Sequence, residues 1–469
     1  NNNTSEIMAT TIEQKPLYDE LVVGQDVIFS VSNTPIVSGF TGVKIIAEVF
    51  ISNASAPNPS VNTDLVGTFK TTPNNSGVGM FDFRPIIESF VSTDNLARVG
   101  SSYKGSTNTT DTNVPIHLID RYSGNKNIIR YFAVKFTTEY VDSDGDIVVD
   151  GTTDISSNLT IFNGYLKYTD GLDLTGVDFG YNLLPFKLAT DTNIFLSNAP
   201  LIQYANLNDY GTIGILALNN KLSYIKLNYL DSTGTQLDTE NIFRTTANGA
   251  YDIFTAFSEF NILYFGCFPA NLQGSSTKFQ ALVTAGTIQG GSIIVQAFGT
   301  GIGEAISKQY TIDLNCPNTK GFEPIRLCWL NQWGVWDYYT FTMKSSKMIS
   351  TKGSTYQQLE GSWNDSAYRI DSFRGGKKAF RVNATEKITM NTDFVNESES
   401  SWFEELINSP EVYILEDFQD DTVTSALNKY VTPVRLTTSS YTRKTIANDK
   451  IMQYTFEVEK SKTLRTQSV

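Results

Sequence analysis

A single residue in this chain has the side chain that most hydrolytic enzymes use as a general base. That residue, His117, lies in the segment PIHLID (115–120) between apolar neighbours, and the sequence has no other histidine. Mechanisms of the Ser-His-Asp and Cys-His types need such a base beside a positioned nucleophile. The sequence has no GxSxG turn to hold a serine, and its His and Cys residues are not clustered as zinc ligands are. We therefore predict a structural role for His117 and no catalytic residue.

Three carboxylates, those of Asp142, Asp144 and Asp146, fall within five residues, as they do in calcium-binding loops. A loop of the EF-hand type would carry a glutamate at its twelfth position, where this chain has Thr153. The DSDG segment (142–145) is typical of a tight turn between two strands. We therefore predict a hairpin turn here, with no metal and no cofactor.

Glycoside hydrolysis stays open as an enzymatic alternative, because it needs two carboxylates and no histidine. No pair stands out among the 49 Asp and Glu residues, although exposed aromatic side chains such as Trp363 or Tyr368 could stack on sugar rings. The run GTGIGE (299–304) has no following helix and is interpreted as a turn, not as a dinucleotide-binding motif. We expect a protein that is not an enzyme, with a glycan hydrolase as a less favoured alternative.

Charge and cysteine content narrow the classes of partner. The net charge of −13 argues against nucleic acid, which needs concentrated Lys and Arg. No apolar run approaches the ~20 residues that a membrane span requires. The three cysteines, Cys267, Cys316 and Cys328, form no CxxC pair. We interpret them as buried thiols of a protein made in a reducing cytoplasm, with a bridge between Cys316 and Cys328 as the alternative.

Aromatic residues are concentrated in the segment RLCWLNQWGVWDYYTF, from Arg326 to Phe341. It holds three of the chain's five tryptophans, and Gly334 interrupts it. This pattern predicts a strand, a turn and a second strand. Each large ring can bury about 150–250 Å², so we expect the hairpin to anchor a core or to dock on another subunit. The candidate interface or core anchors are Trp329, Trp333, Trp336, Tyr338, Tyr339 and Trp402.

The elements that position these residues are predicted to be mainly β-strands. Apolar and polar residues alternate at period two in several segments, for example 43–52, 128–140 and 451–459. A helix is expected within 81–91, with Pro85 in its first turn. The clearest helix is predicted from Glu397 to Asn408, with Asn396 as its N-cap and Trp402 on its apolar stripe. We expect tandem β-sandwich (Ig-like) domains and a C-terminal α+β unit with one or two short helices.

At 469 residues the chain is too long for one hydrophobic core. We expect an N-terminal arm (1–20), a β-sandwich domain with one short helix (21–190) and a second β-sandwich domain (191–320). The aromatic hairpin then opens a C-terminal α+β domain (321–469).

Several segments, quoted in chain order, carry a resemblance to a known family. They are VKIIAEVFI (43–51), GVGMFDFRPIIESFV (77–91), FLSNAP (195–200), LCWLNQWGVWDYYTF (327–341), SPEVYILE (409–416) and VRLTTSSYTRKTIANDKIMQYTFEVE (434–459). Together they resemble virion structural proteins, of the tail or baseplate type, from tailed bacteriophages that infect Bacteroidota and marine bacteria. The resemblance implies a virion location, assembly in the host cytoplasm and contacts with other virion structural proteins.

The favoured hypothesis is a structural component of the tail, baseplate or tail tip that acts through protein–protein contacts. We expect a homo-oligomer with three-fold or six-fold symmetry, because phage tails impose such arrangements. The alternative is a host receptor- or carbohydrate-binding virion protein, which would make a host-surface glycan a partner. A neck or head-associated protein is less favoured.

Overall fold

The chain forms two compact units in the computed structural model. The structure describes residues 9–53, 56–98, 114–167, 183–218, 221–244, 260–300, 303–314, 321–362, 366–416, 430–440, 442 and 452–465. Unit 1 consists of Asn1–Asn315 and Leu330–Asp337, and unit 2 consists of Cys316–Trp329 and Tyr338–Val469. The division therefore runs through the aromatic hairpin, whose tip belongs to unit 1.

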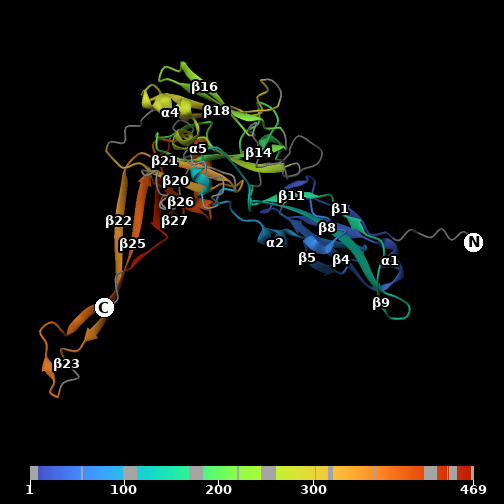
Figure 1. Cartoon of the computed structure of the whole chain (residues 1–469). Coiled ribbons are helices and arrows are strands. Elements are labelled where there is room, and N and C mark those ends of the chain that lie inside the picture. Colours follow the sequence, from blue (N-terminus) through green and yellow to red (C-terminus); the bar gives the residue numbers. More distant parts are fainter. Residues whose placement is uncertain are drawn as a thin grey trace, which may run out of the picture. The chain divides into compact units, whose positions relative to one another are not determined.

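The first part of unit 1 contains two sheets of antiparallel and mixed pairing (Figure 1). The smaller sheet has the order β1 (Thr11–Gln14), β3 (Ile28–Ser32), β6 (Val78–Asp82). The larger sheet has the order β2 (Glu20–Val22), β11 (Leu159–Phe162), β8 (Ile129–Val141), β4 (Thr41–Ser52), β5 (Leu65–Thr71), with β9 (Ile147–Val149) and β10 (Asp154–Ile155) paired on β8.

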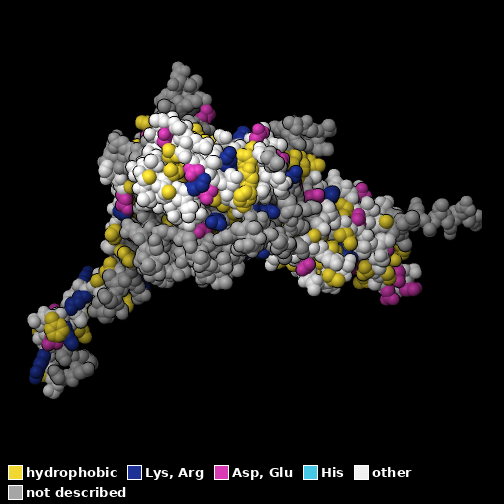
Figure 2. Space-filling view, turned by 45° about the horizontal axis from the view of Figure 1, so that its top comes forward, with side chains coloured by type: hydrophobic (Ala, Val, Ile, Leu, Met, Phe, Trp, Pro, Cys, Tyr) yellow, Lys and Arg dark blue, Asp and Glu magenta, His cyan; other side chains and the backbone are white. Residues whose placement is uncertain are grey.

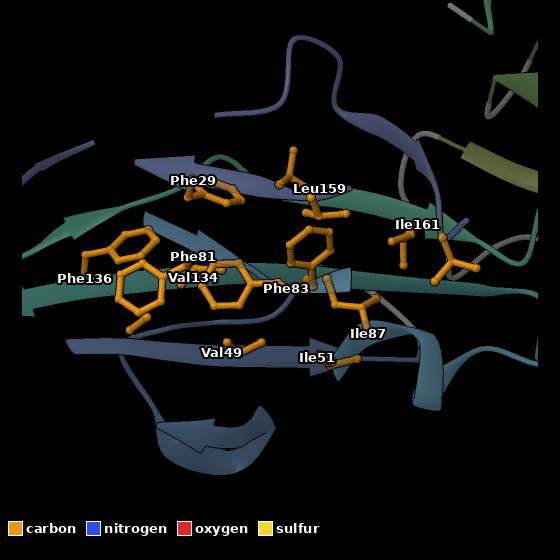
Figure 3. Close-up of a cluster of buried hydrophobic side chains, with 14 of the residues drawn as sticks. Phe29, Val49, Ile51, Phe81, Phe83, Ile87, Val134, Phe136, Leu159 and Ile161 are labelled. Atoms are coloured by element: carbon orange, nitrogen blue, oxygen red, sulfur yellow. The ribbon is translucent and has the colours of Figure 1, made fainter. Parts of the chain in front are cut away.

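A cluster of buried apolar side chains joins these two sheets. Figure 3 shows the rings of Phe29, Phe81, Phe83 and Phe136 gathered together, with Val49 and Ile51 of β4 beside them. Phe81 and Phe83 lie stacked with their ring centroids 5.6 Å apart. The alternation of apolar residues along β3, β4, β6 and β8 supplies this core, because every second side chain of a strand points to the same face.

The second part of unit 1 contains a four-stranded and a five-stranded sheet. The first has the order β12 (Lys187–Leu188), β14 (Thr212–Leu218), β17 (Phe260–Gly266), β7 (Tyr122–Gly124). The second has the order β13 (Ile202–Tyr204), β19 (Tyr310–Asp313), β18 (Ser292–Phe298), β15 (Tyr224–Leu230), β16 (Gln236–Phe243).

The helices of unit 1 are short. They are α1 (Thr34–Gly39), η1 (Asn62–Asp64), α2 (Arg84–Ile87), η2 (Glu88–Phe90), η3 (Ile116–Leu118), η4 (Leu184–Phe186), α3 (Pro269–Ser275) and α4 (Thr277–Thr284). The helix expected within 81–91 is confined to 84–90, because Phe81 and Asp82 belong to β6. Pro85 stands in its first turn as expected, where a missing N–H costs nothing.

Unit 2 is built on one eight-stranded sheet. Its order is β21 (Trp336–Phe341), β20 (Ile325–Leu330), β26 (Val412–Leu415), β27 (Val431–Leu436), β28 (Thr455–Lys460), β25 (Gly376–Asn391), β22 (Ser345–Gln358), with β29 (Leu464–Arg465) on β25. A two-stranded sheet, β23 (Gly361–Ser362) and β24 (Arg369–Ile370), lies between β22 and β25 in the chain.

The helix of unit 2, α5 (Glu397–Asn408), has the bounds that the sequence predicts. The side chain of Asn396 accepts from the backbone N–H of Glu399, and the Glu399 side chain accepts from the backbone N–H of Asn396. This capping box satisfies donors that the first turn of a helix leaves without partners.

The described residues form a mainly β fold with several sheets and few short helices, as expected. The four-stranded sheet takes β7 and β12 from one side of the expected boundary at 190 and β14 and β17 from the other. The boundaries at 20, 190 and 320 stay predictions.

Candidate interaction surfaces

The aromatic hairpin closes through the turn that its sequence predicts. Asn331 N–H donates to the carbonyl of Val335 at 2.8 Å, and Gly334 N–H donates to the carbonyl of Asn331 at 3.0 Å. The Asn331 side chain accepts from the N–H groups of Trp333 and Val335. Its amide donates to the carbonyl of Leu196 at 2.9 Å, so one asparagine both shapes the turn and fixes it in unit 1.

Two of the six predicted anchors belong to the tip and lie buried in unit 1. The Trp333 ring packs on Phe186 with 3.9 Å between centroids. The Trp336 ring meets His117 edge-on at 4.7 Å, and its indole N–H donates to the carbonyl of Asp94 at 2.9 Å. His117 is itself buried, and its ring packs against Trp336; its structural role stays a prediction.

Trp336 points away from its neighbours in the strand, as alternation requires. Val335 lies against Gly214, where an added Cβ would come within 2.7 Å of it. The carboxylate of Asp337 accepts from the Ser197 hydroxyl at 2.7 Å. The two faces of the tip therefore contact different parts of unit 1.

The remaining anchors belong to the core of unit 2. Trp329 and Trp402 lie with centroids 4.8 Å apart, and Tyr339 packs edge-on against Trp402 at 6.0 Å. On the opposite face of the hairpin, Tyr338 lies under the guanidinium of Arg326, 5.3 Å from its ring centroid. Five of the six anchors are buried and Tyr339 is half-buried, so within one chain they are core residues.

The buried carboxylate of Asp94 underlies the site of Trp336. It accepts from the N–H of Asn127 at 2.6 Å, from the N–H of Lys126 at 3.1 Å and from the Tyr264 hydroxyl at 3.3 Å. Burial raises the pKa of Asp94, while these hydrogen bonds and the charge of Arg130 oppose the rise. The group holds the loop before β8 in place, and its geometry is that of a structural anchor.

The DSDG segment and the cysteines are the other positions that the sequence singled out. Asp142 accepts from the N–H groups of Asp144 and Asp146, and Gly145 has φ of +86°, so DSDG forms the predicted hairpin turn between β8 and β9. The described residues contain no group of three or more His, Cys, Asp or Glu that could hold a metal ion. Cys267 and Cys328 are buried thiols that form no disulfide, and burial strongly raises the pKa of Cys328. Cys316 and Trp363 lie outside the described residues.

The most exposed element of unit 2 is the ribbon of β22 and β25, which we call the arm (residues 345–391). β22 has 14 residues, all described, and none of them is buried. The two strands run side by side away from the rest of the sheet, with β23 at the far end (Figure 1). β22 is also the last strand of its sheet, so its outer backbone groups have no strand partner in the described part of the chain.

Large apolar side chains are exposed along the arm. The exposed fractions reach 73% for Ile370 and 71% for Phe373, and the other exposed apolar side chains are Met348, Ile349, Leu359, Tyr368 and Phe380. An exposed apolar surface rimmed by polar residues is typical of a protein-binding site. Residues 383–384 and 387–391 of β25 also pair with β29 and β28, and beyond them the arm is a two-stranded ribbon. Such a ribbon is only marginally stable in water, so this outer part stands to gain from docking.

Sequence reasoning did not find the arm. β22 and the first part of β25 lack the apolar alternation that marks a half-buried strand, because both of their faces are exposed or only partly buried. The available signal was the length of a Thr-, Ser- and Lys-rich segment with isolated Ile, Tyr and Phe residues between two predicted elements.

Comparisons with known proteins provide no family for the chain. No protein-family model matches it, and no curated protein matches it either. Within the described ranges, no helix has both the length and the hydropathy needed to cross a bilayer.

Proposed function

We propose that this protein is a structural component of a tailed-phage virion, in the tail, baseplate or tail tip. It acts through protein–protein contacts in a symmetric assembly, and it reaches its place from the host cytoplasm. The observation that carries the proposal is the arm, because a long ribbon with exposed apolar side chains on both faces is suited to binding another protein. The segments that resemble phage virion proteins support the placement of the protein in a tailed-phage virion.

We also infer that unit 1 holds tandem β-sandwiches of the Ig-like kind. The support is the core cluster shared by the three-stranded and seven-stranded sheets, together with the second pair of sheets in the same unit. In a sandwich the inward faces bury one another, as the Phe29, Phe81 and Phe136 rings do here.

Electron microscopy of virions tests the location, and light scattering of the purified chain tests the assembly. We expect labelled protein at the tail in several copies, and a purified oligomer of three-fold or six-fold symmetry. A purified chain that stays monomeric and is missing from particles would refute the proposal.

A variant with a shortened arm tests whether assembly depends on the arm. Thr351 and Ala384 face each other in the register, so a two-residue Asn-Gly turn can join them in place of residues 352–383. The pairing of β25 with β28 lies outside the deleted part and is retained. We expect cooperative unfolding like that of the full chain, with loss of assembly. An assembly that survives the deletion would contradict a role for the arm.

A receptor- or glycan-binding virion protein is the second candidate. The observation in its favour is the exposure of Tyr368 and Phe373 near the end of the arm, where rings could stack on sugars. Binding of the purified chain to host-cell glycans, lost in Tyr368→Ala, would favour this candidate over a purely structural role.

A further inference from the structure

The arm is basic although the chain as a whole is acidic. Residues 345–391 hold eight Lys and Arg against four Asp and Glu, a net charge of +4 in a chain whose net charge is −13. The remaining residues therefore carry −17. Lys and Arg side chains are visible along the arm in Figure 2, interspersed with hydrophobic ones.

Several of these cations have no ion-pair partner among the described residues. Lys347 pairs with Glu323, Lys387 with Glu457 and Arg374 with Asp371. By contrast, Lys352, Lys377 and Arg381 form no ion pair with any described residue. Unpaired exposed charges of one sign create a field that attracts an oppositely charged surface.

The strand register places part of this charge on one face. Lys352 lies opposite Asn383, and Ser354 lies opposite Arg381, so the Lys352 and Arg381 side chains share a face. Tyr356 lies opposite Lys378 beyond an irregularity in the register, and its ring packs edge-on against Phe380 at 6.4 Å. This face therefore combines cations with aromatic and apolar area.

We propose that the arm of one copy docks on the acidic surface of a second copy of this chain. The inference rests on the proposed function, since it names the partner of the surface that carries it. Charge complementarity selects a second copy, because the rest of the same chain supplies the opposite sign in excess. The 14 residues of β22, at about 3.4 Å each, span about 45 Å, enough to cross much of a neighbouring domain.

The end of the β8–β9 hairpin is the acceptor that best matches the arm. Asp144 and Asp146 are exposed there, and Figure 2 shows acidic side chains gathered at this end of unit 1. Ile147 and Val149 are 73% and 53% exposed beside them. An acidic rim around exposed apolar side chains is the counterpart of the basic face of the arm, which also carries Met348 and Phe380.

Such a contact joins two different surfaces, one from each copy. Every chain then binds one neighbour through its arm and a second neighbour through its acceptor, so the contacts continue head to tail. When the rotation between neighbours closes, the product is a ring.

Charge reversal on the full chain tests the proposal by sedimentation or light scattering. We expect Lys352→Glu with Arg381→Glu to weaken self-association about tenfold to thirtyfold, since exposed ion pairs contribute up to ~1 kcal/mol each. Raising the salt concentration should also weaken the self-association of the unmodified chain. Mixing this variant with an Asp144→Lys, Asp146→Lys variant should restore hetero-association between the two.

Lys221→Glu with Lys308→Glu is the matched control, because both lysines are exposed in unit 1 without an ion pair to any described residue. It makes the same change in net charge and should leave self-association unchanged. Equal weakening by control and arm variants would overturn the proposal, as would an arm variant that associates normally. Binding of an oligonucleotide by a monomeric chain, lost in the arm variant, would overturn it in favour of nucleic acid.

The proposed function is tested separately by the presence of the protein in virions. A chain that is monomeric in solution yet present in the tail overturns this inference alone. Its absence from particles counts against the proposed function.

Discussion

Trp336, one of the anchors named from the sequence, packs and forms a hydrogen bond inside unit 1. Its ring fills the space beside His117, and its N–H donates to the carbonyl of Asp94. We expect Trp336→Ala to lower the free energy of unfolding by about 3–5 kcal/mol, because it removes buried ring area and leaves a cavity. Denaturant unfolding measures this value.

Two further variants separate packing from hydrogen bonding at this position. Trp336→Phe keeps an aromatic ring but removes the indole N–H, and we expect it to cost about 1–3 kcal/mol, because the carbonyl of Asp94 loses a buried partner. Tyr368→Ala removes an exposed ring and should change stability by no more than about 0.5 kcal/mol. A Trp336→Ala protein as stable as Tyr368→Ala would show that the indole anchors nothing.

Asp94 gives the stability of unit 1 a specific pH dependence. Unfolded Asp94 titrates near 3.8, whereas burial raises its pKa in the folded state. Between the two values the folded state binds more protons, so the free energy of unfolding falls as the pH rises through this window and then stays level. Asp94→Asn lacks this component, so the stability difference between the unmodified chain and the variant should shrink as the pH rises. Urea unfolding from pH 3.5 to 7 measures it.

Asp231 supplies a control of opposite sign. Hydrogen bonds from Thr233 and Thr235 lower its pKa, so it stabilises the folded state above 3.8 and loses this effect as the pH falls. The stability difference between the unmodified chain and Asp231→Asn should therefore grow with rising pH. If the stability difference changed with pH in the same direction for both variants, burial would not be the cause of the pKa shift of Asp94.

At the scale of elements, the sequence predicted those helices and turns that depend on interactions between neighbouring residues. The bounds of α5 followed from Asn396 and Glu399, whose capping box needs only three neighbouring positions. The turns at Asn331–Gly334 and Asp142–Gly145 followed from residues that tolerate positive φ. The helices α3 and α4 were missed because each is shorter than three turns. Even the apolar residues of α4, Phe279, Leu282 and Val283, therefore mark a helical face only once.

The candidate site was less predictable than the fold. Five of the six aromatic anchors named from the sequence are buried and Tyr339 is half-buried. Which of them enters unit 1 depends on residues such as Phe186 and Asp94, far away in the chain. β22 of the arm gave no periodic signal, because a strand exposed on both faces carries no apolar pattern to detect.

Gly334 makes the hairpin turn sensitive to a single methyl group. Its φ is +77°, and an added Cβ would lie 1.7 Å from the carbonyl oxygen of Asn163. We expect Gly334→Ala to destabilise the protein by more than about 4 kcal/mol, since backbone strain and a clash with backbone add together. Thermal unfolding measures the loss.

Gly145→Ala is the matched control, because Gly145 has φ of +86° but open space around an added Cβ. It should cost about 1–2 kcal/mol, the strain alone. Equal losses in the two variants would show that the approach of Asn163 has no energetic weight.

At the scale of the whole molecule, unit 1 is completed by residues from beyond its own main segment. A fragment ending at Asn315 lacks the tip, Leu330–Asp337, and with it the partners of Leu196, Phe186 and Asp94. We expect this fragment to lose cooperative unfolding, measured by circular dichroism, whereas a fragment ending at residue 343 retains it. Cooperative unfolding of the shorter fragment would contradict the role of the tip.

The separation of 242 residues between Trp336 and Asp94 also has a consequence during synthesis. A ribosome adds about 5–20 residues per second, so Asp94 emerges roughly 12–50 s before the indole that covers it. Through that interval the carbonyl of Asp94 and the ring of His117 lack the indole that packs on them in the folded protein. The site of Trp336 therefore cannot reach its final packing until synthesis has reached the last third of the chain.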